Sequence, residues 1–218
     1  HKFFQTAQDH KRVGENDTGK NTGGMGAYSP SRLYSTEMDK KINERIIYPT
    51  LKGIKELGTT YCGFLYIGLM IVNNEPFLIE FNVRMGDPEC QTILPILDTD
   101  LGEIILSCCN KKLLDINIKW KAKKSVCIVL CSNGYPDNYQ KNIKINQINN
   151  IKLNNDEYIF HAGTKIKDGN FLATGGRVLN IVATTENFQK SKEKSVKILG
   201  KLDWKEGFFR KDIAYKVT

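Results

Sequence analysis

Residues 77–84 (FLIEFNVR) have the residue types of a site for a cation and a phosphate. Their composition predicts a strand, in which side chains alternate between two faces. One face then carries Leu78, Glu80, Asn82 and Arg84. The other face carries Phe77, Ile79, Phe81 and Val83. The oxygens of Glu80 and Asn82 can converge on one hard cation such as Mg²⁺, and Arg84 can hold a phosphoryl or carboxylate group through paired hydrogen bonds. The alternative is an exposed strand face with ordinary polar residues.

The sequence Gly-Asp-Pro-Glu follows this strand at once. Asp87 and Glu89 keep its neighbourhood anionic, and the intervening proline stiffens the turn. A second charged cluster, QDHKR, lies upstream and includes Lys11. By itself that cluster is typical of a solvated face.

The loop 17–30 (DTGKNTGGMGAYSP) is rich in glycine. Its glycines allow positive φ angles and a close approach of the backbone to a ligand. Exposed N–H groups in such a loop suit phosphate or carboxylate oxygens. The spacing is neither that of a Walker A loop nor that of a dinucleotide-binding G-x-G-x-x-G after a strand. A flexible turn is therefore the alternative reading.

Two further short motifs lie in the second half of the chain, HAGT at 161–164 and GGRV at 175–178. His161 and Arg177 are each close to glycine, which indicates an edge that faces a ligand. A histidine within a strand is otherwise more often a satisfied structural residue.

The surrounding pattern predicts the elements that must position these residues. Thr36 and Asp39 resemble a capping box at the start of a helix, which Pro49 should kink or divide. Residues 61–84 are predicted to form a β-hairpin that turns at Asn73-Asn74. Further predicted elements are a helix near 99–110 with Leu101, Ile104, Ile105 and Cys108 inward, strands within 125–136, 158–164 and 177–185, and a helix at 185–200. This is an α+β chain, with a boundary predicted near residue 120 between domains 1–120 and 121–218.

Composition excludes several classes of protein. The 218 residues are 40% hydrophobic and 26% charged, which is ordinary for a globular chain. The net charge of +8 raises the question of nucleic acid, but the lysines are dispersed and the aromatics lie in apolar runs, so we expect no nucleic-acid partner. No apolar run approaches the ~20 residues of a membrane span. Six cysteines without a C-x-x-C pair, and three histidines without zinc spacing, predict reduced thiols in the cytoplasm.

The motifs together resemble the phosphoribosylamine–glycine ligases (glycinamide ribonucleotide synthetases). QDHKRVGENDTGKNTGGMGAYSP, GFLYIGL, IEFNVRMGDPECQ, HAGT, GGRV and FFRKDI occur here in that family's order, over essentially the whole chain. The resemblance implies an ATP-grasp ligase of purine biosynthesis that uses ATP and Mg²⁺ or Mn²⁺. It joins glycine to 5-phosphoribosylamine through glycyl phosphate and forms glycinamide ribonucleotide, ADP and phosphate.

The resemblance also implies roles for individual residues. Glu80 and Asn82 become the metal ligands, and Arg84 and Lys11 become catalytic residues that stabilise phosphoryl charge. The place of a further acidic ligand in related enzymes falls near Gly68, so no third protein ligand is expected. The implied substrate-binding residues are Asp17, Thr18, Asn21, Gly23, Gly24, Gly26, Asp87, Glu89, His161, Thr164, Gly176 and Arg177.

The same resemblance implies that residues 1–120 are the C-terminal half of an ATP-grasp domain, an antiparallel sheet with helices, and that 121–218 are the small C-terminal domain. We therefore expect the 218 residues alone to be inactive. Fusion to, or cooperation with, other purine-pathway enzymes stays open. The alternatives are another ATP-grasp ligase or carboxylase of purine synthesis, which needs bicarbonate instead of glycine, and a basic nucleic-acid-binding module, which needs salt-dependent RNA binding.

Overall fold

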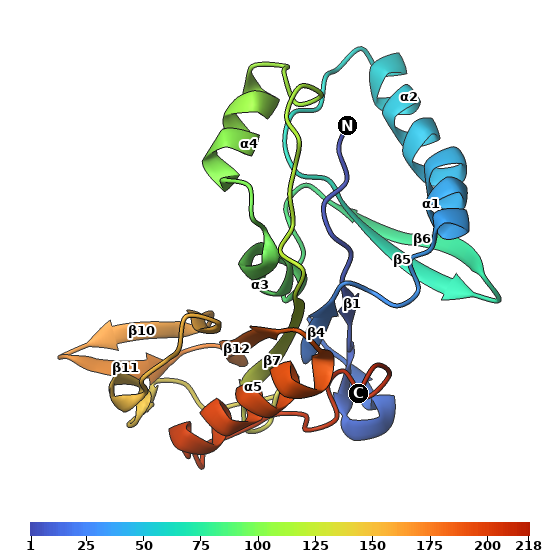
Figure 1. The fold of residues 1–218 in the computed structure, drawn as a ribbon. Coiled ribbons are helices and arrows are strands. Elements are labelled where there is room, and N and C mark those ends of the chain that lie inside the picture. Colours follow the sequence, from blue (N-terminus) through green and yellow to red (C-terminus); the bar gives the residue numbers. More distant parts are fainter. The chain divides into compact units, whose positions relative to one another are not determined.

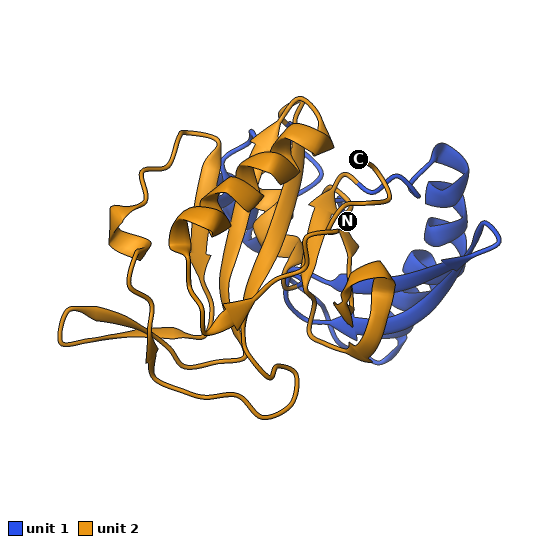
Figure 2. Ribbon diagram, turned by 90° about the horizontal axis from the view of Figure 1, so that it is seen from below, with its two compact units in different colours: residues 1–4, 31–86, 97–120 blue, residues 5–30, 87–96, 121–218 orange.

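The computed structural model describes residues 1–218 and contains two compact units, each assembled from separate stretches of chain (Figure 2). Unit 1 consists of residues 1–4, 31–86 and 97–120. Unit 2 consists of residues 5–30, 87–96 and 121–218. The glycine-rich loop thus belongs to the same unit as the C-terminal residues. The domain boundary near residue 120 stays a prediction.

Unit 1 opens with one helical run in three parts, α1 (Thr36–Ile42), a π turn (Asn43–Ile47) and α2 (Tyr48–Glu56). Its N-cap is Ser35, whose hydroxyl accepts from the Met38 N–H at 3.1 Å, so the predicted cap at Thr36 was wrong by one residue. Pro49 has no N–H to donate to the preceding turn. The π turn directly before this proline accommodates it, and the helix is neither broken nor divided.

The predicted hairpin of unit 1 is confirmed as β5 (Tyr66–Val72) and β6 (Glu75–Asn82), joined by Asn73-Asn74 (Figure 1). Both asparagines have positive φ, of 50° and 60°, as the tightest hairpin turns require. Gly68 pairs with Glu80 and Leu69 pairs with Leu78, so Ile79 is an extra residue that forms a β-bulge.

The bulge corrects the predicted alternation of side chains. Residues paired across the two strands share a face, and β5 alternates regularly. Asn82 and Glu80 therefore share a face with Phe77, whereas Leu78 lies on the opposite face. That opposite face packs on the helical run, where Met38, Ile42 and Ile47 are buried against Ile67, Leu69 and Ile71.

Unit 1 also contains α4 (Leu101–Cys109), close to the predicted helix. Asp100 is its N-cap and accepts from the Glu103 N–H at 2.9 Å. Ile104 is the buried residue of its face, and Ile105 remains 42% exposed. The prediction that Ile105 points inward was therefore wrong.

Unit 2 is built on a six-stranded sheet in which every pairing is antiparallel. Its order is β1 (Gln8–Asp9), β4 (Gly26–Ser29), β7 (Lys124–Ser132), β12 (Arg177–Thr185) and β9 (Glu157–His161). A short strand, β13 (Gly207–Phe208), also pairs with β7. β7 and β12 are buried along nearly their whole length, as their apolar sequences predict.

One helix and several short elements complete unit 2. α5 (Phe188–Leu202) packs on β7 and β12 (Figure 1) and buries Ile198, Leu199 and Leu202 in the core. The remaining elements are β2 (Arg12–Gly14), β3 (Thr18–Asn21), α3 (Glu89–Ile93), the three-stranded sheet of β10 (Thr164–Lys167), β11 (Asn170–Ala173) and β8 (Ile143–Lys144), and three 3-10 turns, Glu15–Asp17, Leu94–Ile96 and Ile148–Asn150. Antiparallel sheets with segregated helices confirm the predicted α+β class.

Candidate active site

In unit 1, the two predicted metal ligands lie on the face of β6 that the helices leave open. Glu80 is exposed and Asn82 is half-buried, and both share that face with Gly68 of β5. A Cβ atom added to Gly68 would lie 3.0 Å from Glu80 Cγ. The absence of a side chain at Gly68 therefore leaves space beside the carboxylate.

The donors on this face fit a hard divalent cation. A carboxylate and an amide supply the oxygen ligands that Mg²⁺ prefers, and water and phosphate oxygens usually complete its coordination. No cluster of three or more His, Cys, Asp or Glu side chains in the structure could hold a metal ion by itself. Glu80 and Asn82 thus fit a cation that is shared with a phosphate ligand.

Arg84 follows β6 in the same unit. Its side chain is exposed, and its Nη1 donates to the carbonyl of Met85 at 2.8 Å. Because the side chain is exposed, an anion could bind the remaining N–H groups of the guanidinium.

In unit 2, Arg177 of β12 joins the glycine-rich loop to the Gly-Asp-Pro-Glu turn. Its Nη1 donates to the carbonyl of Gly23 at 2.8 Å and to that of Asp87 at 2.9 Å, and its Nη2 forms an ion pair with the Asp87 carboxylate at 2.7 Å. The chain therefore brings together three predicted site residues that are far apart in sequence. The guanidinium acts on these loops as a positioning group.

A buried carboxyl lies directly beside these two loops. A Cβ atom on Gly24 would lie 2.5 Å from Pro88 Cδ and 2.8 Å from Asp9 Oδ1, and Gly24 has a φ of +118°, so only glycine fits here. Burial, and then the negative charge of Glu89, raise the pKa of Asp9 to about 7. Lys11 forms an ion pair with Asp9 at 2.8 Å and opposes this rise.

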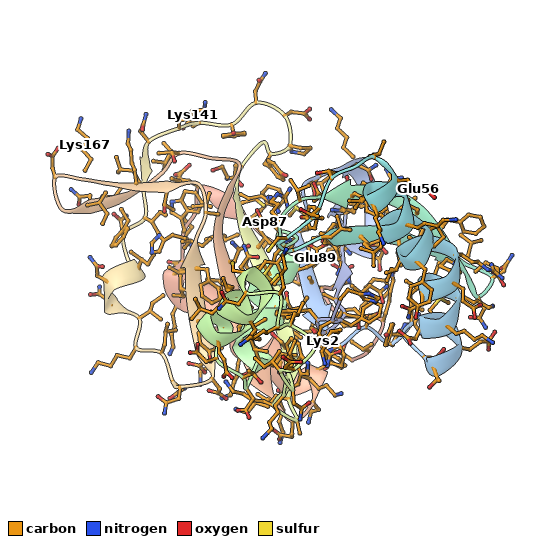
Figure 3. The ribbon with its side chains drawn as sticks, turned by 90° about the horizontal axis from the view of Figure 1, so that it is seen from above. Lys2, Glu56, Asp87, Glu89, Lys141 and Lys167 are labelled. Carbon is orange, nitrogen blue, oxygen red and sulfur yellow. The ribbon has the colours of Figure 1, made fainter.

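Asp87 and Glu89, labelled in Figure 3, differ in their surroundings. Asp87 is half-buried and accepts from Arg177 and from Gln91 Nε2, at 2.9 Å for the latter. Glu89 is only 5% exposed and is the first residue of α3. With Asp9, Lys11 and Arg177, these residues form a group of opposite charges.

Tyr135 holds the same loops from another side. Its hydroxyl accepts from the Gly23 N–H at 3.0 Å, and a Cβ atom on Gly176 would lie 2.2 Å from its ring. Gly176 is therefore needed for the close packing of Tyr135. Nearby, the Gly163 carbonyl accepts from Thr174 and Gly175, which joins the HAGT and GGRV turns.

The exposed His161 and the half-buried Thr164 form a pair at the edge of this region. His161 Nδ1 and Thr164 Oγ1 are 2.9 Å apart, and the imidazole stacks on Phe171 with ring centroids 5.0 Å apart. The stacking fixes the imidazole in place and leaves both residues accessible to a ligand.

Asp17 has several protein partners. Its carboxylate accepts from Arg210 at 3.0 Å, and from Tyr215 and Lys216 at 2.9 Å each. Burial alone would raise the pKa of Asp17, but the hydrogen bonds from Lys216, Tyr215 and Arg210 outweigh it and hold that pKa well below its usual range. The residue links the loop to the C-terminal segment, and its substrate-binding role stays a prediction.

His10 is a second buried group of this network. Its Nε2 accepts from the Ala214 N–H, and its Nδ1 lies 3.3 Å from the Gly26 carbonyl. Burial, and then the positive charge of Arg210, lower the pKa of His10 to about 4. The imidazole is therefore neutral and structural at neutral pH.

The remaining predicted residues lie at different depths in the loop. Thr18 and Asn21 are exposed on β3, whereas Gly26 is buried in β4, where a Cβ would meet the Cys127 carbonyl at 2.5 Å. The sequence analysis missed Asp9 and Tyr135. The position of Asp9 within the charged QDHKR cluster was the available signal, but its burial depends on contacts with distant residues.

The fold and these sites define the class of protein. The biotin carboxylase domain of a thermophilic 2-oxoglutarate carboxylase, solved with bicarbonate, has the same fold with a TM-score of 0.54 at 13% identity, over 81% of this chain and 39% of its own. Residues 1–90 match the family model described as "Phosphoribosylglycinamide synthetase, ATP-grasp (A) domain". Residues 125–216 match the model described as "Phosphoribosylglycinamide synthetase, C domain". The chain is therefore of the ATP-grasp class.

Two closer relatives identify the family. The phosphoribosylamine–glycine ligase of Brucella melitensis is 41% identical over 213 residues, which are 98% of this chain and 50% of that protein. The solved phosphoribosylamine–glycine ligase of Thermotoga maritima has a TM-score of 0.84 at 32% identity, over 96% of this chain and 51% of its own. The chain belongs to the phosphoribosylamine–glycine ligase family, as its motifs predicted, and spans about half the length of the relatives it matches.

None of the helices combines the length and the apolar composition that a membrane span requires.

Proposed function

We propose that this chain provides part of a ligase that joins glycine to 5-phosphoribosylamine at the expense of ATP, giving glycinamide ribonucleotide, ADP and phosphate. The observation that carries the proposal is the open face of β6, where Glu80 and Asn82 lie opposite Gly68, in a chain whose relatives bear the name of that ligase. Because the chain spans half of those relatives, we propose that residues 1–218 alone do not complete the reaction.

ATP and a divalent cation supply the phosphoryl group and neutralise its charge when they are bound. Glu80 and Asn82 are the proposed ligands of that cation, which is Mg²⁺ by its preference for oxygen donors, with Mn²⁺ as its substitute. The exposed guanidinium of Arg84 stabilises negative charge on the transferring phosphoryl group. This is catalysis by position and electrostatics, with no covalent bond to the protein.

Unit 2 carries the proposed recognition of the small substrates. The glycines of the loop at Gly23 and Gly24 allow its backbone to come close to the glycine substrate, and Lys11 provides a positive charge for a phosphate. His161 and Thr164 contribute polar atoms for phosphoribosylamine. The same role is proposed for Asp17, Thr18, Asn21, Gly26, Asp87, Glu89, Gly176 and Arg177. Six cysteines outside disulfides support the cytoplasm as the site of activity.

The test is an ADP-release assay on the purified full-length protein. Release is expected to require glycine and phosphoribosylamine together, and to form glycinamide ribonucleotide in equal amount. Bicarbonate in place of glycine is the matched control, because the biotin carboxylase domain that shares this fold was solved with bicarbonate bound. ADP release with bicarbonate and without glycine would overturn the proposal.

A further inference from the structure

Three of the six cysteines gather in unit 1. Cys62 lies in the exposed segment between α2 and β5, which has no regular structure. Cys108 and Cys109 are in the last turn of α4. Sequence spacing gives no sign of this cluster, because Cys62 and Cys108 are 46 positions apart.

The geometry pairs two of these thiols. Cys62 Sγ lies 3.7 Å from Cys108 Sγ, and it donates to the Cys108 carbonyl at 3.7 Å. A disulfide has an S–S distance of about 2.0 Å, so its formation requires the sulfurs to approach by roughly 1.7 Å. Rotation of the Cys62 side chain and a small shift of its irregular segment can supply this movement.

We propose that Cys62 and Cys108 are a dithiol that converts reversibly into a disulfide by exchange with a low-molecular-weight disulfide such as oxidised glutathione. The Cys62 thiolate attacks one sulfur of the small disulfide, forms a mixed disulfide and releases one small thiol. The Cys108 thiolate then attacks Cys62 Sγ and releases the second small thiol. Two protein thiols are oxidised and one small disulfide is reduced, so no other oxidant is needed.

The remaining cysteines differ in ways that make them useful references. Cys127 and Cys131 are fully buried in the core of unit 2, where burial raises the pKa of Cys131 to about 12. Cys90 is half-buried, and burial, followed by the charges of Asp87 and Glu89, raises its pKa. Cys131 Sγ contacts the thioether of Met25 at 3.8 Å, and Cys127 Sγ lies 4.0 Å from the amide oxygen of Asn180.

The chemistry also predicts a dependence on pH. The hydrogen bond with Cys108 raises the pKa of Cys62 above its ordinary value, so the thiol form dominates at neutral pH. The thiolate is the attacking species. As long as the pH is below that pKa, each increase of one pH unit should therefore make exchange about tenfold faster. Once formed, the bond ties the segment before β5 to the end of α4.

The experiment incubates the purified protein at stepped ratios of reduced to oxidised glutathione, blocks residual thiols, and maps peptides by mass spectrometry without reduction. The expected product is a cross-link between the peptides of Cys62 and Cys108 that reverses with excess reduced glutathione. Cys62→Ser and Cys108→Ser should each abolish it, whereas Cys90→Ser and Cys109→Ser should retain it.

Two outcomes would overturn the proposal. One is glutathione attached to Cys62 with no cross-link at any ratio. The other is a cross-link that survives Cys108→Ser and disappears with Cys109→Ser, because the partner would then be the neighbouring cysteine. The wild-type measurement needs no substitution, so a variant that fails to fold cannot hide either result.

Discussion

The hairpin of unit 1 and the central sheet of unit 2 hold their polar residues by different means. On β6, Phe77 is 54% exposed and Ile79 is 63% exposed, and one helical run covers a single face. In unit 2, nearly every residue of β7 and β12 is buried. Arg210, which follows β13, is 1% exposed and forms ion pairs with Asp17 and Asp212. Substitutions in the hairpin should therefore change chemistry more than stability, and those in the unit 2 network should do the reverse.

The largest effect is expected at Arg210, which is 1% exposed and bonds Asp17, Asp212 and the carbonyl of Arg12. Arg210→Ala should lower the free energy of unfolding by about 3–5 kcal/mol, because it leaves partly buried carboxylates without their cation. Urea denaturation measures this change. The control is Lys205→Ala, whose ion pair with Asp203 is exposed and contributes less than about 1 kcal/mol. Equal losses in the two variants would contradict the contrast between the units.

The next effect tests the hairpin. Glu80→Gln keeps the shape of the side chain but removes its charge, and it should lower kcat of glycine-dependent ADP release by about 10²–10³-fold. Its free energy of unfolding should stay within about 0.5 kcal/mol of wild type, because the side chain is exposed. Glu56→Gln, at the exposed end of α2, is the matched control and should change neither quantity. A large loss of stability in Glu80→Gln would show that the hairpin depends on this carboxylate for its fold.

The third effect concerns pH and the neutral His10 of unit 2. Its pKa is about 4 in the folded state against 6.5 when exposed, so the unfolded state binds a proton first as pH falls. Between pH 6.5 and 4, wild type should therefore lose about 3 kcal/mol relative to His10→Gln, and no more below pH 4. Asp9, whose raised pKa acts with the opposite sign over this range, is present in both proteins and cancels in the difference. Parallel stability curves would mean that the pKa of His10 is the same in the folded and unfolded states.

The smallest expected effect is the change in the free energy of unfolding when one of two glycines is replaced by alanine. Gly53 in α2 has no atom within 4 Å of an added Cβ, so Gly53→Ala should raise the free energy of unfolding by about 0.5–1 kcal/mol. Gly24→Ala should lower it, because the new atom would overlap Pro88 and the φ of +118° disfavours alanine. Thermal unfolding of the two variants distinguishes these signs. A stabilised Gly24→Ala would show that the loop relaxes freely.

Local patterns were enough to predict much of the fold. The turn at Asn73-Asn74, the buried strand that became β7 and the amphipathic helix that became α5 each depend on residues near one another in sequence. The bulge at Ile79 was not predictable in this way, because nothing in the alternation of FLIEFNVR marks an extra residue. Its existence depends on how β5 pairs with β6.

In the candidate site, too, arrangements of residues that are close in sequence could be predicted, and contacts between distant residues could not. Glu80 and Asn82 could be placed on one face because they are two residues apart and follow the bulge. The contact of Arg177 with Gly23, and the burial of Asp9 beside Glu89, required knowledge of residues 154 and 80 positions apart in the chain. Roles proposed for the individual residues stay predictions that the variants above can test.

The interleaving of the two units has a consequence for the order of folding. The helix and hairpin at residues 36–82 of unit 1 consist of neighbours in sequence and can form as soon as they are synthesised. In unit 2, the Asn16 N–H donates to Asp212 across 196 positions, and Ile213 lies against Gly26. The strand at residues 26–29 pairs with β7 and packs against Ile213, so its contacts are complete only after those residues have been synthesised. We expect unit 2 to fold later than the helix and hairpin of unit 1, as the slower step.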